Sequence, residues 1–124
     1  MYFQAIRGAI TIDSDTPEEI YSKTKELLCC IVHKNNLVSD QIVSVIFTAT
    51  HDIKSAYPAV AARQLGFTDI PLMCCQEMYV NESLNKCIRV LMHIQSADKI
   101  QVHHMYLRKA ALLRPDLSSE ECTT

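Results

Sequence analysis

Two oppositely charged side chains, Glu77 and Arg89, lie about a dozen residues apart in segments that otherwise predict buried strands. A lone charge in an apolar strand is costly unless it is paired or used, so each of these side chains needs a partner or a ligand. Arg7 and Arg114 stand in similarly apolar sequence. Several cations and one carboxylate in such settings would suit a small anionic ligand that also carries a hydroxyl group.

The elements that must position these residues can be predicted from hydrophobic periodicity and from helix and turn signals. Asp15-Thr16 provides an N-cap ahead of a proline and two glutamates, and helical spacing of apolar residues then continues to about Asn35. Pro58 opens a short helix that Gly66 stops. The predicted strands cover residues 2–12, 42–48, 70–75, 86–95 and 102–113.

This order of elements predicts an α+β domain with a five-stranded mixed β-sheet, one long helix and one short helix. We expect a single domain over residues 1–117, followed by a polar, mobile tail over residues 118–124. The long helix can cover only one face of the sheet, yet the strands are apolar on both faces. A homo-oligomer that buries the second face is therefore predicted.

The composition narrows the class of protein. The chain has 124 residues, of which 48% are hydrophobic and 21% charged, as is ordinary for a soluble globular domain. Its net charge of -2 gives no support for nucleic-acid or membrane binding. No apolar run approaches the length of a membrane-spanning helix and the N-terminus does not resemble a signal peptide, so a cytoplasmic protein is predicted.

Neither the cysteines nor the histidines have the spacing of a metal or redox site. The six cysteines include two adjacent pairs, at 29–30 and 74–75, and adjacent residues on a strand point to opposite faces. Reduced, mostly buried thiols are the preferred interpretation, with a secreted disulfide framework as the alternative. The adjacent histidines at 103–104 diverge in the same way, so no metal site is predicted. No His–Asp pattern supports Cys74 as a nucleophile.

Six segments, in order, resemble the monofunctional chorismate mutases of the AroH class and cover the chain from about residue 5 to residue 117. They are Ile6-Arg7-Gly8-Ala9, Thr48-Ala49-Thr50-His51-Asp52, Tyr57-Pro58-Ala59 with Arg63, Cys74-Cys75-Gln76-Glu77-Met78, Lys86-Cys87-Ile88-Arg89-Val90 and Leu113-Arg114-Pro115-Asp116-Leu117. The resemblance implies a homotrimer whose sheets pack into a pseudo-α/β barrel with active sites at the subunit interfaces. It also implies the rearrangement of chorismate to prephenate, in phenylalanine and tyrosine biosynthesis.

The chemistry of that reaction fits the charges in the sequence. A concerted [3,3] rearrangement needs no nucleophile, general base, metal or organic cofactor. An enzyme helps by holding the flexible side chain of chorismate over the ring and by placing positive charge where the breaking ether bond builds negative charge. Arginine suits this task because its planar fork grips carboxylates with two bonds and stays charged.

The resemblance also implies roles for individual residues. Arg89 would face the ether oxygen and one carboxylate, and Glu77 would accept a hydrogen bond from the ring hydroxyl beside Cys74. Arg7 would bind the side-chain carboxylate with support from Tyr106. The full implied set of substrate-binding residues is Arg7, Tyr57, Ala59, Arg63, Leu72, Met73, Cys74, Cys75, Gln76, Glu77, Met78, Arg89, Tyr106, Leu113 and Arg114, of which those between 57 and 63 and at 113–114 would come from the neighbouring subunit.

The sequence departs from the family pattern at a few positions. Val60 stands where lysine is common, Tyr57 stands where phenylalanine is usual, and the segment 81–83 replaces a glycine-rich turn. Two alternatives to a mutase remain open at this level. One is a non-catalytic trimeric small-molecule-binding or regulatory protein on the same fold, and the other is a trimeric imine hydrolase of similar architecture.

Overall fold

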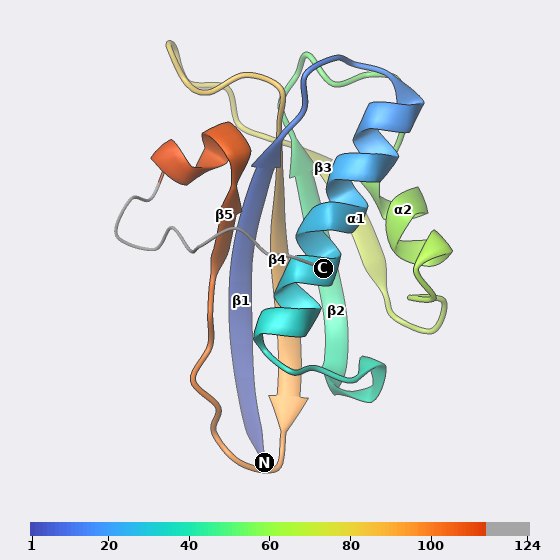
Figure 1. Ribbon diagram of the computed structural model, residues 1–124, viewed down its shortest axis with the longest axis vertical. Helices are drawn as coiled ribbons and strands as arrows, with labels where there is room; N and C mark the ends of the chain where they lie inside the picture. Colours follow the sequence, from blue (N-terminus) through green and yellow to red (C-terminus); the bar gives the residue numbers. More distant parts are fainter. Residues whose placement is uncertain (114–124) are drawn as a thin grey trace.

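One five-stranded sheet organises residues 1–113, the part of the chain that the computed structural model describes. In spatial order its strands are β3 (Leu72–Gln76), β2 (Ile42–Ala49), β4 (Cys87–Ser96), β1 (Tyr2–Thr11) and β5 (Met105–Leu107). The pairs β1–β4 and β2–β4 are antiparallel, whereas β2–β3 and β1–β5 are parallel (Figure 1). The predicted α+β fold with a mixed sheet is confirmed.

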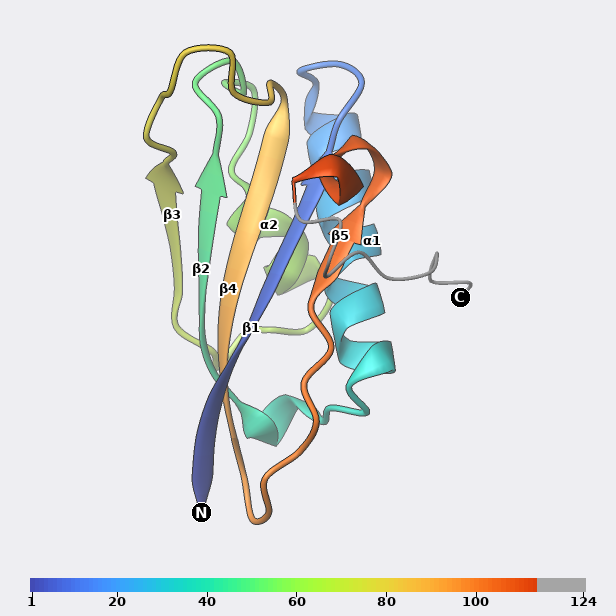
Figure 2. The same cartoon turned by 90° about the vertical axis from the view of Figure 1, so that its left-hand side faces the viewer.

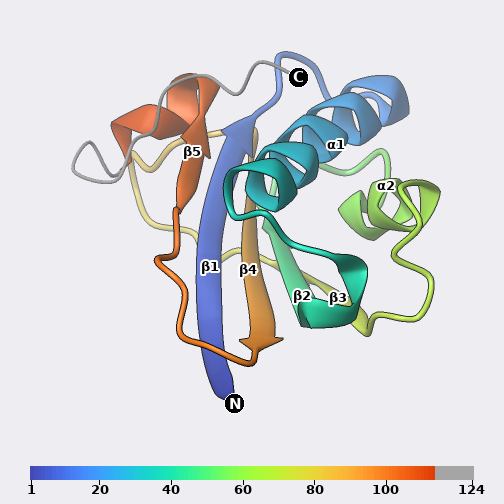
Figure 3. The same cartoon turned by 60° about the horizontal axis from the view of Figure 1, so that its bottom comes forward.

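Both helices lie on the same face of this sheet (Figures 1 and 3). The long helix α1 (Pro17–Lys34) begins as predicted, because Thr16 Oγ1 accepts a hydrogen bond from the backbone N–H of Glu19 at 3.2 Å. The short helix α2 (Pro58–Gln64) is followed by Gly66, whose φ of 99° suits glycine. Within residues 1–113 no helix is long and apolar enough to cross a membrane.

The core lies between α1 and the sheet, and a glycine allows their close approach. A Cβ atom at Gly8 would lie 2.9 Å from Ile31 Cδ1 and 3.2 Å from Leu27 Cδ1, both on α1. The neighbouring β1 residues Ile6 and Ile10 are fully buried on the same face. Each such side chain contributes about 1.5–3 kcal/mol through burial, so this contact anchors the helix layer to the sheet.

Neither α1 nor α2 covers the opposite face of the sheet, which is therefore largely open (Figures 1 and 3). Alternate residues of the strands point to this open face, and they include large apolar side chains. Phe3 is 71% exposed and Met73 is 59% exposed, while Ile46 and Leu91 are partly buried. An apolar face of this kind is what the sequence predicts for a surface that another copy covers.

The predicted strand over residues 102–113 is wrong in its extent, since β5 covers only Met105–Leu107. In the stretch before β5, the backbone of residues 100 and 103 bonds to side chains and not to a neighbouring strand. The side chain of Gln4 forms two hydrogen bonds with the backbone of Ile100: Oε1 accepts from Ile100 N at 3.1 Å, and Nε2 donates to Ile100 O at 2.8 Å. Asn35 binds the backbone of His103 in the same way: Oδ1 accepts from His103 N at 2.7 Å, and Nδ2 donates to His103 O at 3.0 Å.

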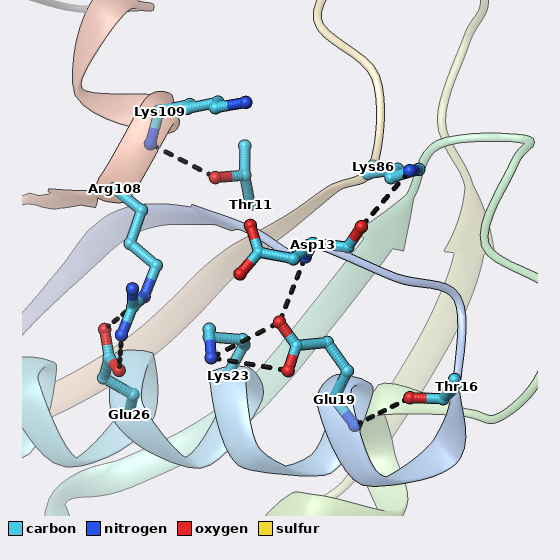
Figure 4. A network of polar contacts seen from close by, with 9 residues as sticks. All are labelled: Thr11, Asp13, Thr16, Glu19, Lys23, Glu26, Lys86, Arg108 and Lys109. Atoms are coloured by element: carbon cyan, nitrogen blue, oxygen red, sulfur yellow. Dashed lines mark hydrogen bonds and ion pairs between the residues drawn. The ribbon is translucent and has the colours of Figure 1, made fainter.

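After β5 the chain turns into the 3₁₀ helix η2 (Arg108–Leu112). Arg108 begins this turn with a φ of 56°, and its guanidinium contacts Glu26 of α1 (Figure 4). The backbone N–H of Lys109 donates to Thr11 Oγ1 at 3.1 Å. These contacts explain why the strand ends at Leu107. A second 3₁₀ helix, η1 (Ser39–Gln41), precedes β2 and is not predicted from the sequence.

Three connections gather at one end of the sheet, namely those from β1 to α1, from β2 to α2 and from β3 to β4 (Figure 2). Hydrogen bonds join them to one another. Asp15 Oδ1 accepts from the backbone N–H groups of Lys54 and Ser55 at 3.0 and 3.1 Å. Lys86 Nζ donates to the backbone oxygen of Asp13 at 3.2 Å. The residues near this end therefore share one bonded framework.

Candidate active site

The strand pairing places Arg7 and Arg89 on the same face of the sheet, the face that the helices leave open. In the β1–β4 pair Arg7 lies opposite Leu91, and Arg89 lies opposite Ala9. On its other side Arg89 lies opposite Thr48 of β2. Residues directly opposite each other share a face, as do alternate residues along a strand. The two predicted cations are thus brought close together by register alone.

Glu77 joins this group as the residue directly after β3. Its backbone N–H donates to Ala49 O at 2.9 Å, which continues the pairing of β3 with β2. Arg89 Nε donates to Glu77 Oε1 at 2.6 Å, and Thr48 Oγ1 donates to the same oxygen at 3.3 Å. The side chains of Arg89 and Glu77 are 34% and 15% exposed. Each charge therefore has the partner that its apolar surroundings require.

The ion pair leaves part of the guanidinium available. It uses Nε of Arg89, and within residues 1–113 the two terminal amino groups of Arg89 donate to no other side chain. Glu77 fixes the rotation of the guanidinium plane from one side, because the 2.6 Å bond is short and charge-assisted. The edge formed by the terminal amino groups can then bind an anion with two hydrogen bonds.

A pocket of about 240 Å³ opens on this face beside Arg89. Its polar lining consists of Arg7, Thr48, Arg89 and Tyr106, over an apolar floor. Tyr106 lies opposite Ala9 in the β1–β5 pair and is only 3% exposed, whereas Arg7 is exposed. Two cations, a phenol and a hydroxyl around a small pocket suit an anion with a polar substituent.

The other predicted substrate-binding residues do not lie around this pocket. Tyr57 lines a second hollow, of about 640 Å³, together with Cys74, and is 71% exposed. Burial raises the pKa of the Cys74 thiol, against the opposing effects of a hydrogen bond from the backbone of Ala59 and of the charge of Arg63. Ala59 and Arg63 therefore belong with Cys74 and Tyr57, at the β3 edge of the sheet.

The two adjacent cysteines of β3 face opposite sides of the sheet. Cys75 lies opposite Thr48 and shares the open face with Arg89, whereas Cys74 lies opposite Phe47 on the helix-covered face. The divergence expected for neighbouring residues on a strand is confirmed. Residues 1–113 contain no group of three or more His, Cys, Asp or Glu side chains that could hold a metal ion.

Cys87 lies on the same face of the sheet as Arg89, outside the lining of the pocket, and its burial favours the thiol form. Burial raises its pKa to about 12, which outweighs the lowering effect of the nearby Arg89 charge, while Glu77 and Asp52 act in the same direction as burial. Only a thiolate is strongly nucleophilic, so Cys87 does not supply a nucleophile near neutral pH. It packs with Ala9, Tyr106 and Ala110 in a small buried cluster on this face.

The remaining predicted residues of β3 and of the segment after it spread over both faces. Leu72 is partly buried on the helix-covered face, whereas Met73 is on the open face. Gln76 ends β3 and lines the second hollow. Met78 is 82% exposed in the segment that leads to β4.

The C-terminal part of the predicted site is described only as far as Leu113. This residue packs against the buried cluster that includes Cys87 and Tyr106, next to the pocket. Arg114 and the predicted tail over residues 118–124 lie outside the described residues.

Thr48 is a site residue that the sequence did not single out. Its hydroxyl bonds to Glu77, and its strand position lies opposite Arg89. The sequence does contain a signal for Thr48. Ser44 and Thr48 are four residues apart, so their hydroxyl groups lie on the same face of an otherwise apolar strand. Ser44 Oγ indeed lies 3.1 Å from His93 Nδ1 on the same face.

Comparison with known proteins gives a consistent result. The family model for chorismate mutase type I matches residues 3–117. Chorismate mutase AroH of Bacillus subtilis (strain 168) is 44% identical over 120 residues, which span 95% of this chain and 94% of that protein. Chorismate mutase AroH of Thermus thermophilus is 46% identical over 121 residues, which span 95% of this chain and 98% of that protein.

A solved structure agrees with the sequence comparison. The structure of a chorismate mutase from Clostridium thermocellum superimposes with a TM-score of 0.85 at 44% sequence identity. The match covers 88% of this chain and 98% of that one.

Proposed function

The chain belongs to the type I chorismate mutase family and is a chorismate mutase, and from that premise we propose that it works as a homotrimer with active sites shared between subunits. Its substrate is chorismate and its product is prephenate. The observation that carries the proposal for the site is the Glu77–Arg89 pair at the edge of a small cationic pocket. The alternatives of a binding protein or an imine hydrolase are not favoured by any of the comparisons.

In the proposed mechanism Arg89 stabilises the transition state. The ether oxygen of chorismate gains negative charge as its bond to the ring breaks, and a guanidinium held ready for it lowers the barrier. Glu77 holds the guanidinium by Nε, which supports binding of the ether oxygen and a carboxylate by the terminal amino groups. A preorganised donor of this kind supplies about 3–4 kcal/mol of the roughly 8 kcal/mol that a modest enzyme must provide.

Arg7 and Tyr106 would hold the other end of the substrate. Both line the pocket beside Arg89, and Tyr106 lies under it as a buried wall. We assign the side-chain carboxylate of chorismate to Arg7, since the reaction requires this side chain to fold over the ring. Within residues 1–113 both side-chain hydrogen bonds of Glu77 use Oε1, so Oε2 would accept from the ring hydroxyl.

The separation of the predicted site residues into two groups supports the proposal of a shared site. Tyr57, Ala59 and Arg63 lie at the β3 edge, separate from the pocket that contains Arg7 and Arg89. A neighbouring copy that packs its β3 edge against the open face would bring Arg63 to this pocket. Exposed apolar residues on the open face support such packing.

We further propose a cytoplasmic location. The reaction serves biosynthesis of phenylalanine and tyrosine, and the chain does not use its cysteines as disulfides at the described positions Cys29, Cys74, Cys75 and Cys87. Free thiols of this number are typical of reducing compartments.

Purified protein tests these assignments. Loss of chorismate absorbance with formation of prephenate should be saturable, and the Arg89→Ala variant should lose nearly all of it. The Asp40→Asn variant, changed in the exposed turn η1, provides the matched control. An active protein whose Arg89→Ala variant keeps its turnover would overturn the proposed site.

A further inference from the structure

We propose that Asp52 is a positioning residue, which sets the geometry of the Glu77–Arg89 pair by fixing the segment that joins β3 to β4. The proposal rests on the function proposed above for that pair. Asp52 does not line the pocket beside Arg89, and no role in substrate binding is assigned to it. It acts through other residues.

The Asp52 carboxylate collects hydrogen bonds from two different segments. The backbone N–H of Lys86 donates to both of its oxygens, at 3.0 and 3.2 Å. Thr50 Oγ1 donates to Oδ1 at 2.5 Å. Bonds to an ionised carboxylate are stronger than bonds between neutral groups. Asp52 therefore ties the start of β4 firmly to the end of β2.

Thr50 extends this tie into the strand that carries Arg89. Its hydroxyl accepts from the backbone N–H of Cys87 at 3.0 Å, and its backbone N–H donates to Cys87 O at 3.0 Å. Thr50 is only 6% exposed, so these bonds are shielded from water. Cys87 is two residues before Arg89 and shares its face of the sheet. Asp52 is thus linked to the backbone just before Arg89 by hydrogen bonds through Thr50 and Cys87.

Lys86 needs this support because of its backbone conformation. Its φ is 49°, in the left-handed region that residues with a Cβ atom rarely adopt. Besides Asp52, the backbone N–H of Ile12 contacts it, by donating to Lys86 O at 2.9 Å. Its Nζ donates to Asp13 O at 3.2 Å (Figure 4). The surrounding bonds keep the chain in this turn, and Asp52 supplies two of them.

The other end of the same segment holds Glu77. Its backbone N–H donates to Ala49 O at 2.9 Å, so the stretch between Glu77 and Lys86 is anchored at both ends to residues 49–52. Between the anchors Met78 and Tyr79 are 82% and 59% exposed, although Tyr79 makes an edge contact with the ring of His51 at 5.0 Å and Leu84 packs against a buried cluster that includes Cys87. The hydrogen bonds at the two ends are the points that fix the backbone of this segment, and they set how closely Glu77 approaches Arg89.

The test is a double-mutant cycle between Asp52 and Glu77. Asp52→Asn keeps the size of the side chain but removes its charge and replaces one of the two oxygens that accept from Lys86 N with an amide group that cannot accept. We expect kcat to fall about tenfold or more while KM changes by less than about threefold, because a misplaced guanidinium loses contacts made only in the transition state. In a Glu77→Gln background Asp52→Asn should cause little further loss, since the geometry that Asp52 sets is that of the Glu77–Arg89 pair, which Glu77→Gln already disrupts.

A merely structural role predicts a different pattern. Asp52→Asn would then lower kcat by the same factor with or without Glu77→Gln, and this additivity would overturn the proposal. Equal losses in KM and kcat, or no loss at all, would also overturn it. Asp40→Asn is the matched control, because it removes an exposed carboxylate from η1 without touching the segment between β3 and β4.

Two further variants keep the test valid if Asp52→Asn does not fold. Thr50→Val preserves side-chain shape in a buried position but removes the hydroxyl, so it should reproduce the kcat loss, and Thr50→Ser should restore activity. Lys86→Gly keeps the backbone N–H and suits a positive φ, so it should remain close to wild type. A Thr50→Val variant with normal kcat would refute the proposal. Loss of chorismate turnover in the unmodified protein would instead refute the proposed function.

Discussion

Glu26 and Arg108, which are 82 residues apart in the chain, form a two-point ion pair between α1 and η2. Glu26 Oε1 lies 2.7 Å from Arg108 Nη2, and Oε2 lies 3.1 Å from Nε. The side chains are 37% and 44% exposed, so solvent screening limits the pair to about 0–1 kcal/mol. Arg108 itself has a φ of 56°, which a residue with a Cβ atom rarely adopts, so the pair forms at a strained backbone position.

This relationship predicts an order of stability for two Arg108 variants. Arg108→Ala loses the ion pair and keeps the unfavourable φ, whereas Arg108→Gly loses the ion pair but relieves the backbone. We expect the glycine variant to be the more stable of the two, by about 1 kcal/mol in the free energy of unfolding. Urea denaturation measures the difference. An alanine variant that is the more stable would show that the backbone at 108 is not strained.

Arg89→Lys should be far more damaging than its conservative character suggests. Lysine keeps the charge but loses the planar fork that bonds to Glu77 and to the substrate together. We expect a loss of about 3 kcal/mol or more in transition-state stabilisation, mainly in kcat. Arg63→Ala should chiefly raise KM, because a cation at the pocket mouth meets substrate and transition state alike. Steady-state kinetics with chorismate provide the measurement. If Arg63→Ala abolished turnover and Arg89→Lys did not, the roles assigned to the two arginines would have to be exchanged.

Mixing two defective variants tests the shared site directly. Arg89→Ala removes a residue of the open face and Arg63→Ala removes one of the β3 edge. In randomly mixed trimers about a quarter of the sites would combine an intact face with an intact edge, since each half comes from a different subunit. Activity at low chorismate should therefore rise after co-refolding. No recovery, with a trimer mass by light scattering, would place both arginines in one subunit's site.

Asp15 should make the free energy of unfolding depend on pH in the acidic range. Hydrogen bonds from the backbone of Lys54 and, to a lesser extent, of Ser55 hold the pKa of this carboxyl below its ordinary value of 3.8. Because the pKa is lower in the folded state, the contribution of Asp15 is complete above about pH 4 and is lost as the pH falls through the folded value. The stability difference between wild type and Asp15→Asn, measured by denaturant titration, should shrink below about pH 4. A difference that grows with acid would contradict this account.

The rate should depend little on pH around neutrality and should not change with added metal ions or a chelator. The proposed roles of Arg7, Glu77 and Arg89 require no proton transfer during the rearrangement. A pH profile of kcat in buffers of constant ionic strength is the measurement. A bell-shaped profile centred near pH 7 would indicate acid–base catalysis instead.

Much of the fold could be predicted because the local signals agree with one another. Thr16 caps α1 as its residue type suggests, and Gly66 adopts the positive φ expected after α2. The fifth strand could not be predicted in full. Apolar residues between 102 and 113 have strand character, but Gln4 and Asn35, distant in sequence, take over the bonds of the preceding backbone.

The charges of the candidate site were predictable from the sequence, whereas some of the contacts that support them were not. Apolar surroundings mark Glu77 and Arg89 as residues that need partners, and the structure pairs them at 2.6 Å. Thr48 had a signal in the hydroxyl spacing of β2, but its bond to Glu77 and the proposed role of Asp52 depend on strand register and on a left-handed turn at Lys86, which the sequence does not reveal locally. Only three-dimensional structure reveals such positions.

The short ladder between β1 and β5 also has a consequence for dynamics. It joins only Gly8 to Met105, Ala9 to Tyr106 and Ile10 to Leu107, and is the shortest of the described strand pairings. The few backbone bonds here give this edge a lower free energy of local opening than the β1–β4 pair, so its amide protons exchange first. Tyr106 belongs to this edge, so we expect the wall of the pocket that it forms to open locally more often than the β1–β4 pair does. Amide hydrogen exchange of residues 105–107 compared with that of β4 would measure this order.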